Sequence, residues 1–498
     1  MSDVNITDAI FAVAQERPHA VAIIDGESVV SYHTLCAGVH RAAQRFHEAG
    51  WRAGDRIGIS IRGRPALHLL VSLALARCGM TQVSWSAAEP PALIRSRIKV
   101  LDVTAMVSDH LSLESAGIAV LAPDMQWLTS PHDGLVADSY REPGGERFWI
   151  ICESSGTTGR PKLIAITHRQ EEEHGARVTP VLAYLPGERF LNLTALHFMS
   201  GMKRTLRCLK DGGTRVFLPG VVDTPQLLQW IERHDVTYLS GAPVHYHQML
   251  RDISGNSPRL PRLRILRSTG SALPASILQA VRRCITPNVF VDYGLNEISV
   301  ITVAPPDLLA KHAETAGLPL PGVELEVVDA VEQPLPPGVI GRVRTRGPGI
   351  HPSYLPALVE ERERMFRNGW CYTGDVAFLN EEGLLFLKGR ADDVMNFDGI
   401  LIGPAEIESV LCAHPAVVEA AAFPLPSQEH QDVPAAAVVC ATSLQTEELA
   451  RYCAERLGVR TPRFFLRVGT IPRNAMGKVL RNELIQHAIT ILQGRMEG

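Results

Sequence analysis

The chain has 498 residues, of which 46% are hydrophobic and 20% are charged, a balance typical of a globular protein and not of a disordered one. This length predicts two to four domains, because a single hydrophobic core rarely grows beyond about 250–300 residues. With 49 Lys and Arg against 53 Asp and Glu, the formal net charge is −4, so no global basic field favours nucleic-acid binding.

The N-terminal residues and the cysteine spacing indicate the cellular compartment in which the protein is expected. The first twenty residues contain no basic region followed by an apolar one, so they do not resemble a signal peptide. The longest apolar stretch, residues 66–76, is too short to span a bilayer and predicts a buried helix. The nine cysteines form no CxxC pair, so we expect neither a disulfide framework nor a zinc site. We therefore expect a cytoplasmic protein without a membrane span.

The first 390 residues alternate helical and strand patterns. Apolar spacing predicts a helix over residues 32–49, which ends at Gly50, a strand over 56–61, a helix over 65–78 and a strand over 81–85. This order predicts an α/β fold with a parallel sheet and right-handed crossovers. Further strands, each beside a helical stretch, are expected at residues 214–218, 237–240, 265–268 and 289–291.

The pattern changes after about residue 320. Prolines separate short alternating runs such as 323–328 and 341–346, which predict a smaller β subdomain over about 320–388. A hairpin around Asp398-Gly399, a helix over 404–414 and a final helix around 480–492 then predict an α+β domain. The resulting division is an N-terminal α/β domain (1–388), a hinge (389–393) and a small C-terminal domain (394–498).

A loop that follows the predicted strand 148–152 is the strongest local motif. Its glycines allow several backbone N–H groups to point into one hollow, and its hydroxyls and lysine add further donors, which together suit a polyphosphate. The Gly-Lys-Ser/Thr triplet of Walker A is absent, and a plain surface turn is the alternative. The loop residues are Ser154, Ser155, Gly156, Thr157, Thr158, Gly159 and Lys162.

This loop resembles the phosphate loop of the acyl-adenylate-forming superfamily, which comprises acyl-CoA synthetases, adenylation domains and luciferases. Further segments are similar to the other motifs of that superfamily in the same order, so the resemblance covers nearly the whole chain. Four positions depart from it: Asn296 stands where the family has threonine, Met476 where serine is frequent, and Asn396 and Phe397 where lysine and serine are often found. The matching segments are 293–297, 372–375, 389–393 and 472–478.

The resemblance implies roles for individual residues. Lys478 is expected to be the catalytic cation beside the carboxylate and the α-phosphate, and Glu297 is expected to be catalytic as the ligand of a magnesium ion. Asp375 is expected to accept hydrogen bonds from the ribose hydroxyls, with Arg390 supporting it. Asp392 is expected to absorb the backbone change between two domain arrangements.

The resemblance also implies how the nucleotide and the acid are bound. Tyr293 is expected to stack on adenine, opposite Gly270, Ser271 and Ala272. Asp292, Gly294 and Asn296 complete the expected nucleotide site. His197 is expected to line and gate the acyl pocket. The other pocket candidates are mostly apolar and favour an aromatic or short-to-medium acyl acid: Phe198, Met199, Ser240, Ala242, Ile298 and Ile301.

Each of these residues has a plain alternative when taken singly. Tyr293 can be core filling, Asp375 a turn residue and Lys478 a solvated lysine. A basic cluster, Lys203, Arg204 and Arg207, can meet an anionic ligand, but we assign it to a solvated helix face.

The leading functional prediction is an enzyme that activates a carboxylic acid as acyl-AMP and transfers the acyl group to CoA. ATP, Mg²⁺ and CoA are the expected cofactors and co-substrates. One alternative uses the same adenylate with a carrier-protein thiol or an amine as acceptor. Another is a nucleotide-binding protein that has lost catalysis.

Overall fold

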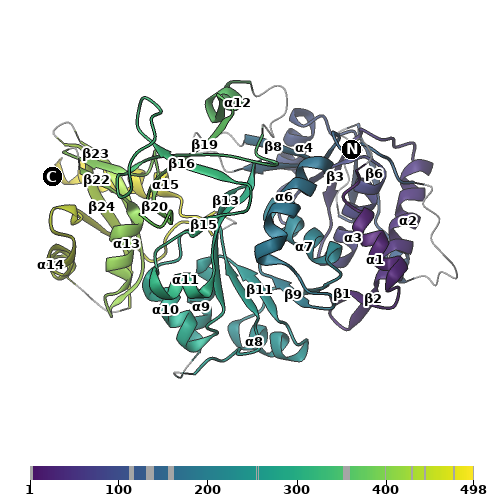
Figure 1. Cartoon of the computed structure of the whole chain (residues 1–498), viewed down its shortest axis with the longest axis horizontal. Helices are drawn as coiled ribbons and strands as arrows, with labels where there is room; N and C mark the ends of the chain where they lie inside the picture. The colour runs from purple at the N-terminus through teal and green to yellow at the C-terminus, as the bar shows by residue number, and fades with distance from the viewer. Residues whose placement is uncertain are drawn as a thin grey trace.

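The computed structural model describes residues 4–110, 117–129, 140–154, 162–253, 255, 257–351, 359–398, 400–427, 430–441, 445–474 and 477–496. The N-terminal two thirds of the chain form the larger part of the molecule, and the C-terminal hundred residues form a smaller part at the opposite end of its long axis (Figure 1).

A nine-stranded sheet dominates the N-terminal part. Its central strands are parallel, whereas β2 at one edge and β14 and β15 at the other are antiparallel. In spatial order the strands are β15 (Leu318–Pro319), β14 (Ser299–Ala304), β13 (Val289–Leu295), β12 (Ile265–Ser268), β11 (Tyr238–Gly241), β9 (Arg189–Asn192), β10 (Thr214–Phe217), β1 (Val21–Asp25) and β2 (Ser28–Ser31).

A second sheet has six strands, and all of its neighbours are parallel except the last pair. In spatial order they are β6 (Ala119–Leu121), β5 (Ala105–Ser108), β3 (Arg56–Ser60), β4 (Thr81–Ser84), β7 (Phe148–Ser154) and β8 (Lys162–Thr167).

Helices connect and cover these two sheets. Helix α3 contacts β1 of the first sheet and β3 and β4 of the second, and its residues from Ala66 to Arg77 are all buried. The apolar stretch predicted to be a buried helix is therefore the helix between the sheets. The helices of this part are α1 (Asp8–Glu16), α2 (Tyr32–Glu48), α3 (Pro65–Arg77), α4 (Pro91–Val100), α5 (Gln126–Thr129), α6 (His168–Leu182), α7 (Met199–Lys210), α8 (Thr224–Arg233), α9 (Pro243–Asp252), α10 (Ala275–Cys284) and α11 (Pro306–Lys311).

An antiparallel sheet follows in the chain. Its spatial order is β16-β17-β19-β18, with β20 paired to β19. The strand β19 is long because its two halves pair with different neighbours, β18 at one end and β20 at the other. The elements are β16 (Glu324–Val328), β17 (Gly341–Arg346), α12 (Val359–Met365), β18 (Phe366–Arg367), β19 (Trp370–Leu379) and β20 (Leu385–Arg390).

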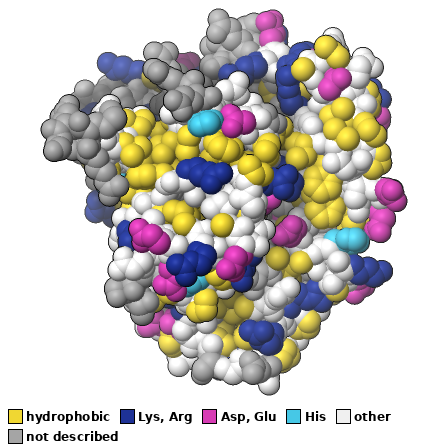
Figure 2. Space-filling model, turned by 90° about the vertical axis from the view of Figure 1, so that its left-hand side faces the viewer, with side chains coloured by type: hydrophobic (Ala, Val, Ile, Leu, Met, Phe, Trp, Pro, Cys, Tyr) yellow, Lys and Arg dark blue, Asp and Glu magenta, His cyan; other side chains and the backbone are white. Residues whose placement is uncertain are grey.

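The C-terminal part packs helices on a sheet of order β22-β21-β24-β23, with β25 parallel to β24. On the face of the molecule in Figure 2, at this end, basic and acidic side chains lie interspersed among hydrophobic ones. The elements are β21 (Met395–Phe397), β22 (Ile400–Ile402), α13 (Pro404–Cys412), β23 (Val417–Ser427), β24 (Gln431–Cys440), α14 (Thr446–Leu457), a 3₁₀ turn (Gly458–Arg460), β25 (Phe464–Arg467) and α15 (Arg481–Met496).

The predicted fold class is confirmed: the chain is α/β with parallel sheets, a large N-terminal part and a smaller, β-rich C-terminal part. The antiparallel edge strands were not predicted, because sequence patterns place strands but not the order of their neighbours. In the parts of the chain that the structure describes, no helix has both the length and the apolar composition needed to cross a membrane. The hinge at 389–393 remains a prediction; β20 ends at Arg390 and β21 begins at Met395.

Candidate active site

A cavity of about 850 Å³ lies where the C-terminal ends of the parallel strands meet the C-terminal part of the chain. A volume of this size is typical of small-molecule sites. Segments far apart in the sequence line it, and they come from the predicted acyl pocket, the 292–296 motif and the terminal lysine motif. These lining residues include His197, Phe198, Met199, Ala242, Gly270, Asp292, Gly294, Asn296, Arg473, Asn474 and Gly477.

Beside this cavity, strands β13 and β19 bring two of the predicted nucleotide residues together. The Tyr293 hydroxyl donates a hydrogen bond to Oδ2 of Asp375 at 2.5 Å. Arg390 lies opposite Asp375 in the β19–β20 ladder and donates to the Thr373 carbonyl at 2.8 Å and to Asp375 Oδ1 at 3.5 Å. Burial raises the pKa of Asp375, although Arg390 and the Tyr293 hydroxyl oppose that shift.

Gly374 allows this arrangement. Its φ is +75°, a left-handed conformation that L side chains rarely adopt. A Cβ at this position would lie 2.7 Å from Nη2 of Arg390, so the guanidinium occupies the space that a side chain would need. The glycine between Thr373 and Asp375 therefore lets Arg390 pack directly over the turn.

Lys478 reaches the same place from the C-terminal part of the chain. Its backbone N–H donates to Oδ1 of Asn474 at 2.9 Å, which closes the turn that lines the cavity. Burial lowers the pKa of Lys478, and the charges of Asp393 and Asp375 oppose that shift. The charges that act on this ammonium group thus include those of Asp375 and Arg390.

Asp292, expected at the nucleotide, has a structural partner that the sequence did not reveal. Its carboxylate accepts hydrogen bonds from Arg267 at 2.7 and 3.0 Å and from the Thr269 hydroxyl at 3.2 Å. Both Asp292 and Arg267 are buried, and both line the cavity. Arg267 on β12 showed no sequence signal, because a single arginine in an apolar strand belongs to no motif.

Glu297, the expected magnesium ligand, is buried between β13 and β14, and its neighbour in the chain, Asn296, lines the cavity. Among the described residues, no group of three or more His, Cys, Asp and Glu side chains is arranged to hold a metal ion. Magnesium commonly binds through one or two carboxylates together with substrate phosphates. A single carboxylate at this position is compatible with that mode of binding, and Glu297 would be the protein ligand.

The predicted phosphate loop lies largely outside the described residues. Ser155, Gly156, Thr157, Thr158 and Gly159 belong to this group. Ser154 and Lys162 are the paired ends of β7 and β8, so the backbone of the two strands holds the loop at its base.

Part of the predicted acyl pocket lines the cavity. Burial lowers the pKa of His197, and its ring packs on Phe198 with centroids 4.1 Å apart. Ser240 is fully buried and does not line the cavity itself; its hydroxyl accepts a hydrogen bond at 3.0 Å from Arg204, which does. Ser271 and Ala272 are exposed beside Gly270.

Two pocket candidates were wrong. Ile298 and Ile301 are fully buried in a hydrophobic cluster with Ile350 and Cys371 and do not line the cavity. The reason is local: the backbone turns sharply between β13 and β14, and Ser299 has a φ of +60°, so the side chains after the 293–297 motif face the core.

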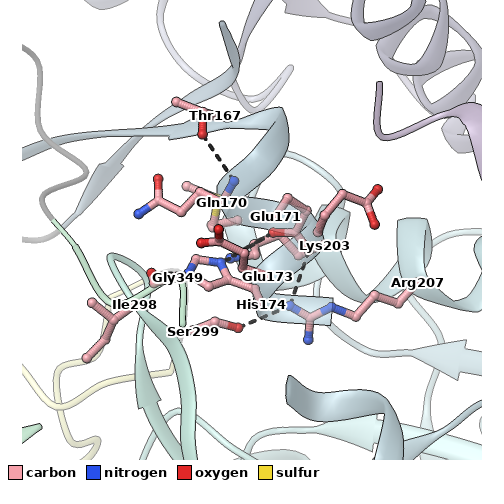
Figure 3. Close-up of polar contacts among 12 residues, drawn as sticks. Thr167, Gln170, Glu171, Glu173, His174, Lys203, Arg207, Ile298, Ser299 and Gly349 are labelled. Carbon is pink, nitrogen blue, oxygen red and sulfur yellow. Dashed lines mark hydrogen bonds and ion pairs between the residues drawn. The ribbon is translucent and has the colours of Figure 1, made fainter. Parts of the chain in front are cut away.

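The assignment of the basic cluster to a solvated face was also wrong. Lys203, Arg204 and Arg207 on α7 are 5–6% exposed and line the cavity. Glu171 and His174, which project from α6, meet Lys203 and Arg207 (Figure 3). The helical spacing that suggested an exposed charged face is the same spacing that presents these charges to a buried neighbour.

The predicted hinge residue, Asp392, is exposed in a turn between the two sheets. The Ala391 N–H donates to the Gly374 carbonyl at 2.9 Å, and the N–H groups of Asp393 and Val394 donate to the Arg390 carbonyl. This turn therefore connects directly to the Asp375 and Arg390 pair.

Comparison with known proteins identifies the class. The family model "AMP-binding enzyme" matches residues 10–355, and the model "AMP-binding enzyme C-terminal domain" matches residues 406–478. The chain therefore belongs to the AMP-binding enzyme family.

Individual relatives are similar over nearly their whole length. A 2-succinylbenzoate–CoA ligase from Bacillus subtilis is 27% identical over 492 residues, covering 95% of this chain and 96% of that protein. A fatty acid–[acyl-carrier-protein] ligase, MmaC, from Mycobacterium marinum is 27% identical over 543 residues, covering 99% and 100%. The structure of O-succinylbenzoate coenzyme A synthetase (MenE) from Bacillus subtilis in complex with ATP and magnesium ion superposes with a TM-score of 0.84 at 26% identity, covering 96% and 98%.

Proposed function

We propose that this protein is an acid–CoA ligase that forms an acyl-AMP from a carboxylic acid and ATP, releases pyrophosphate, and then transfers the acyl group to the thiol of CoA. The observation that carries the proposal is the single cavity bounded by the 292–296 motif, the His197 segment and the Arg473–Gly477 turn. A carboxylate and an α-phosphate that react there are both anions, so charge neutralisation and alignment are the main catalytic needs.

Different residues provide the charge neutralisation and the alignment. Lys478 supplies a cation to the carboxylate and the α-phosphate. Asp375, held by Tyr293 and Arg390, is oriented to accept hydrogen bonds from the ribose hydroxyls. Glu297 holds the magnesium ion, which supplies charge neutralisation on the phosphates when it is bound.

The similarity to relatives named as CoA ligases, and to a structure with bound ATP and magnesium, supports this reaction. All nine cysteines lie among the described residues and none forms a disulfide, which is consistent with a reducing cytoplasm as the compartment.

Acid-dependent exchange between pyrophosphate and ATP tests the first half-reaction without any acceptor. We expect exchange that requires an acid and Mg²⁺, and AMP and thioester accumulation only after CoA is added. The absence of exchange with every acid in a broad panel, despite measurable ATP binding, would support a nucleotide-binding protein without catalysis.

A carrier-protein thiol is the second candidate acceptor, because the relative MmaC is named as an acyl-carrier-protein ligase. Exchange that is normal while CoA fails to accelerate AMP release favours that acceptor. A holo carrier protein in place of CoA would then restore turnover.

A further inference from the structure

The acid end of the cavity contains more buried positive charge than buried negative charge. Among the described residues, four nearly fully buried cations line the cavity, whereas two nearly fully buried carboxylates, Glu171 and Asp292, contact them. Each unpaired charge that is moved out of water costs several kcal/mol. The four cations are Lys203, Arg204, Arg207 and Arg267.

The Asp292 carboxylate lies close to one of these cations and farther from a second. Arg267 takes both of its carboxylate oxygens at 2.7 and 3.0 Å. Arg204 lies 3.9 Å from the same carboxylate and instead donates to two neutral hydroxyls, Ser240 Oγ at 3.0 Å and Thr269 Oγ1 at 2.9 Å. Burial lowers the pKa of Arg204 to about 10, and the charge of Arg267 adds to that shift whereas Asp292 opposes it. The carboxylate that pairs with Arg204 is therefore shared with Arg267.

Glu171 is shared in the same way. It lies 2.9 Å from the Lys203 ammonium and 3.2 Å from Nη2 of Arg207. His174 does not balance these positive charges. Its Nε2 contacts the Gly349 carbonyl at 2.9 Å and its Nδ1 contacts Lys203 at 2.8 Å (Figure 3). Burial lowers the pKa of His174 to about 3, so the ring is neutral at physiological pH.

Arg207 still has donor capacity. Its Nη2 contacts Glu171 and the Ser299 hydroxyl at 3.1 Å, but its buried Nε has no hydrogen-bond partner. Arg204 and Arg207 are three residues apart on α7, so their side chains are neighbours on one helix face. Two neighbouring guanidinium groups that each share their carboxylate with another cation can bind a further oxyanion.

From this geometry we infer that the acid substrate has a second anionic group, a carboxylate or a sulfonate, which binds to Arg204 and Arg207 while the carboxylate to be activated lies toward the Lys478 turn. This inference rests on the proposed function. It changes the expected acid from a mostly apolar one to a dianionic one with an apolar or aromatic spacer, because Phe198, Met199 and Ala242 also line the cavity.

Matched acids test the inference through pyrophosphate release. The panel contains straight-chain and benzene dicarboxylic acids, their monomethyl esters and the corresponding sulfonated carboxylic acids. We expect kcat/KM for the best diacid to exceed that for its monoester by about 10²-fold, because the ester leaves buried guanidinium groups without a partner. The sulfonated acids show whether the second group is a carboxylate or any oxyanion.

Variants of Arg207 test whether the preference for diacids over monoesters depends on this residue. Arg207→Met should reduce the ratio of diacid to monoester to within about threefold while turnover of the monoester persists, and Arg207→Lys should retain part of the ratio. Arg262→Met is the matched control, since Arg262 is an exposed arginine paired with Asp235 on the surface. The control should keep the full ratio.

The outcomes separate this inference from the proposed function. Pyrophosphate release that is equal or faster with monoesters would overturn the second anionic site and leave the ligase proposal standing. An Arg207→Met variant that raises KM for ATP equally with every acid would also overturn it, because the cations would then serve the phosphates. If no acid supports release, the proposed function itself fails. Should Arg207→Met not fold, the ratio in the unmodified enzyme and in Arg207→Lys decides the question.

Discussion

The nucleotide side and the acid side of the cavity are built from different parts of the fold. On the nucleotide side, Tyr293, Asp375 and Arg390 lie on strands and at their turns, and Lys478 follows another turn. On the acid side, cations project from one face of α7 onto α6 and the ends of β11 and β12. The residues of the nucleotide side belong to short, contiguous motifs, whereas the partners of a helix face are scattered through the sequence.

The two regions also differ in the balance between positive and negative side chains. Asp375 and Arg390 pair with each other, and we propose that Lys478 adds a cation where the two anionic reactants meet. At the acid side, Lys203 and Arg207 share one carboxylate and Arg204 has only hydroxyl partners within hydrogen-bond distance. We propose that the first region serves the reaction common to the family and that the second selects the acid.

Removing the Lys478 ammonium should produce the largest effect. We expect Lys478→Ala to lower the rate of adenylation by roughly 10²–10³-fold, because the charge matters most when carboxylate and phosphate meet. ATP affinity should change little. Thioester formation from presynthesised acyl-AMP should largely persist, because we expect that step to use the other domain arrangement. Single-turnover measurements of both half-reactions check this, with Lys311→Ala as an exposed control. Equal losses in both steps would contradict the assigned role.

Asp375→Asn tests the nucleotide side itself. The amide removes the charge that Arg390 and the Tyr293 hydroxyl face, and it accepts hydrogen bonds less strongly than a carboxylate. We expect KM for ATP to rise roughly 10–100-fold while the diacid preference is unchanged. Steady-state kinetics with ATP varied at saturating acid give the answer. A change in acid preference would mean that the two sides are not separate.

Gly374→Ala and Gly369→Ala form a matched pair. Both glycines have a φ of +75°, so each alanine should lower the free energy of unfolding by about 1–2 kcal/mol. Only at Gly374 would the new Cβ meet the Arg390 guanidinium; at Gly369 the space is open. We expect KM for ATP to rise about tenfold in the first variant alone. Similar KM values in both variants would show that Arg390 need not hold its position.

The pH dependence of adenylation should show the smallest effect. Because burial lowers the pKa of Lys478 below the ordinary 10.5, the active ammonium form is lost at a lower pH than for an exposed lysine. The rate should therefore decline on the alkaline side before pH 10.5. Lys478→Arg stays charged across this range, so its slower reaction should show no such decline. Rates measured from pH 7 to 10.5 compare the two, and identical alkaline limbs would exclude Lys478 as the titrating group.

The element types, the two-part α/β organisation and the order of the family motifs can all be predicted from the amino-acid sequence. Helices α2 and α3 and strands β3 and β12 follow their predicted ranges within one or two residues, because hydrophobic periodicity and glycine turns act locally. The segments around Tyr293, Asp375 and Lys478 were identifiable for a similar reason, since each motif occupies a few consecutive residues.

Which charges are buried and which side chains reach the cavity depend on the packing of the folded chain and could not be predicted. Lys203, Arg204 and Arg207 have the spacing of a solvated face, and burial became evident only from Glu171 on another helix. Ile298 and Ile301 adjoin a functional motif but face the core after a sharp turn. Periodicity defines a face of an element, but the neighbour that covers that face is set by packing between segments that are distant in the sequence.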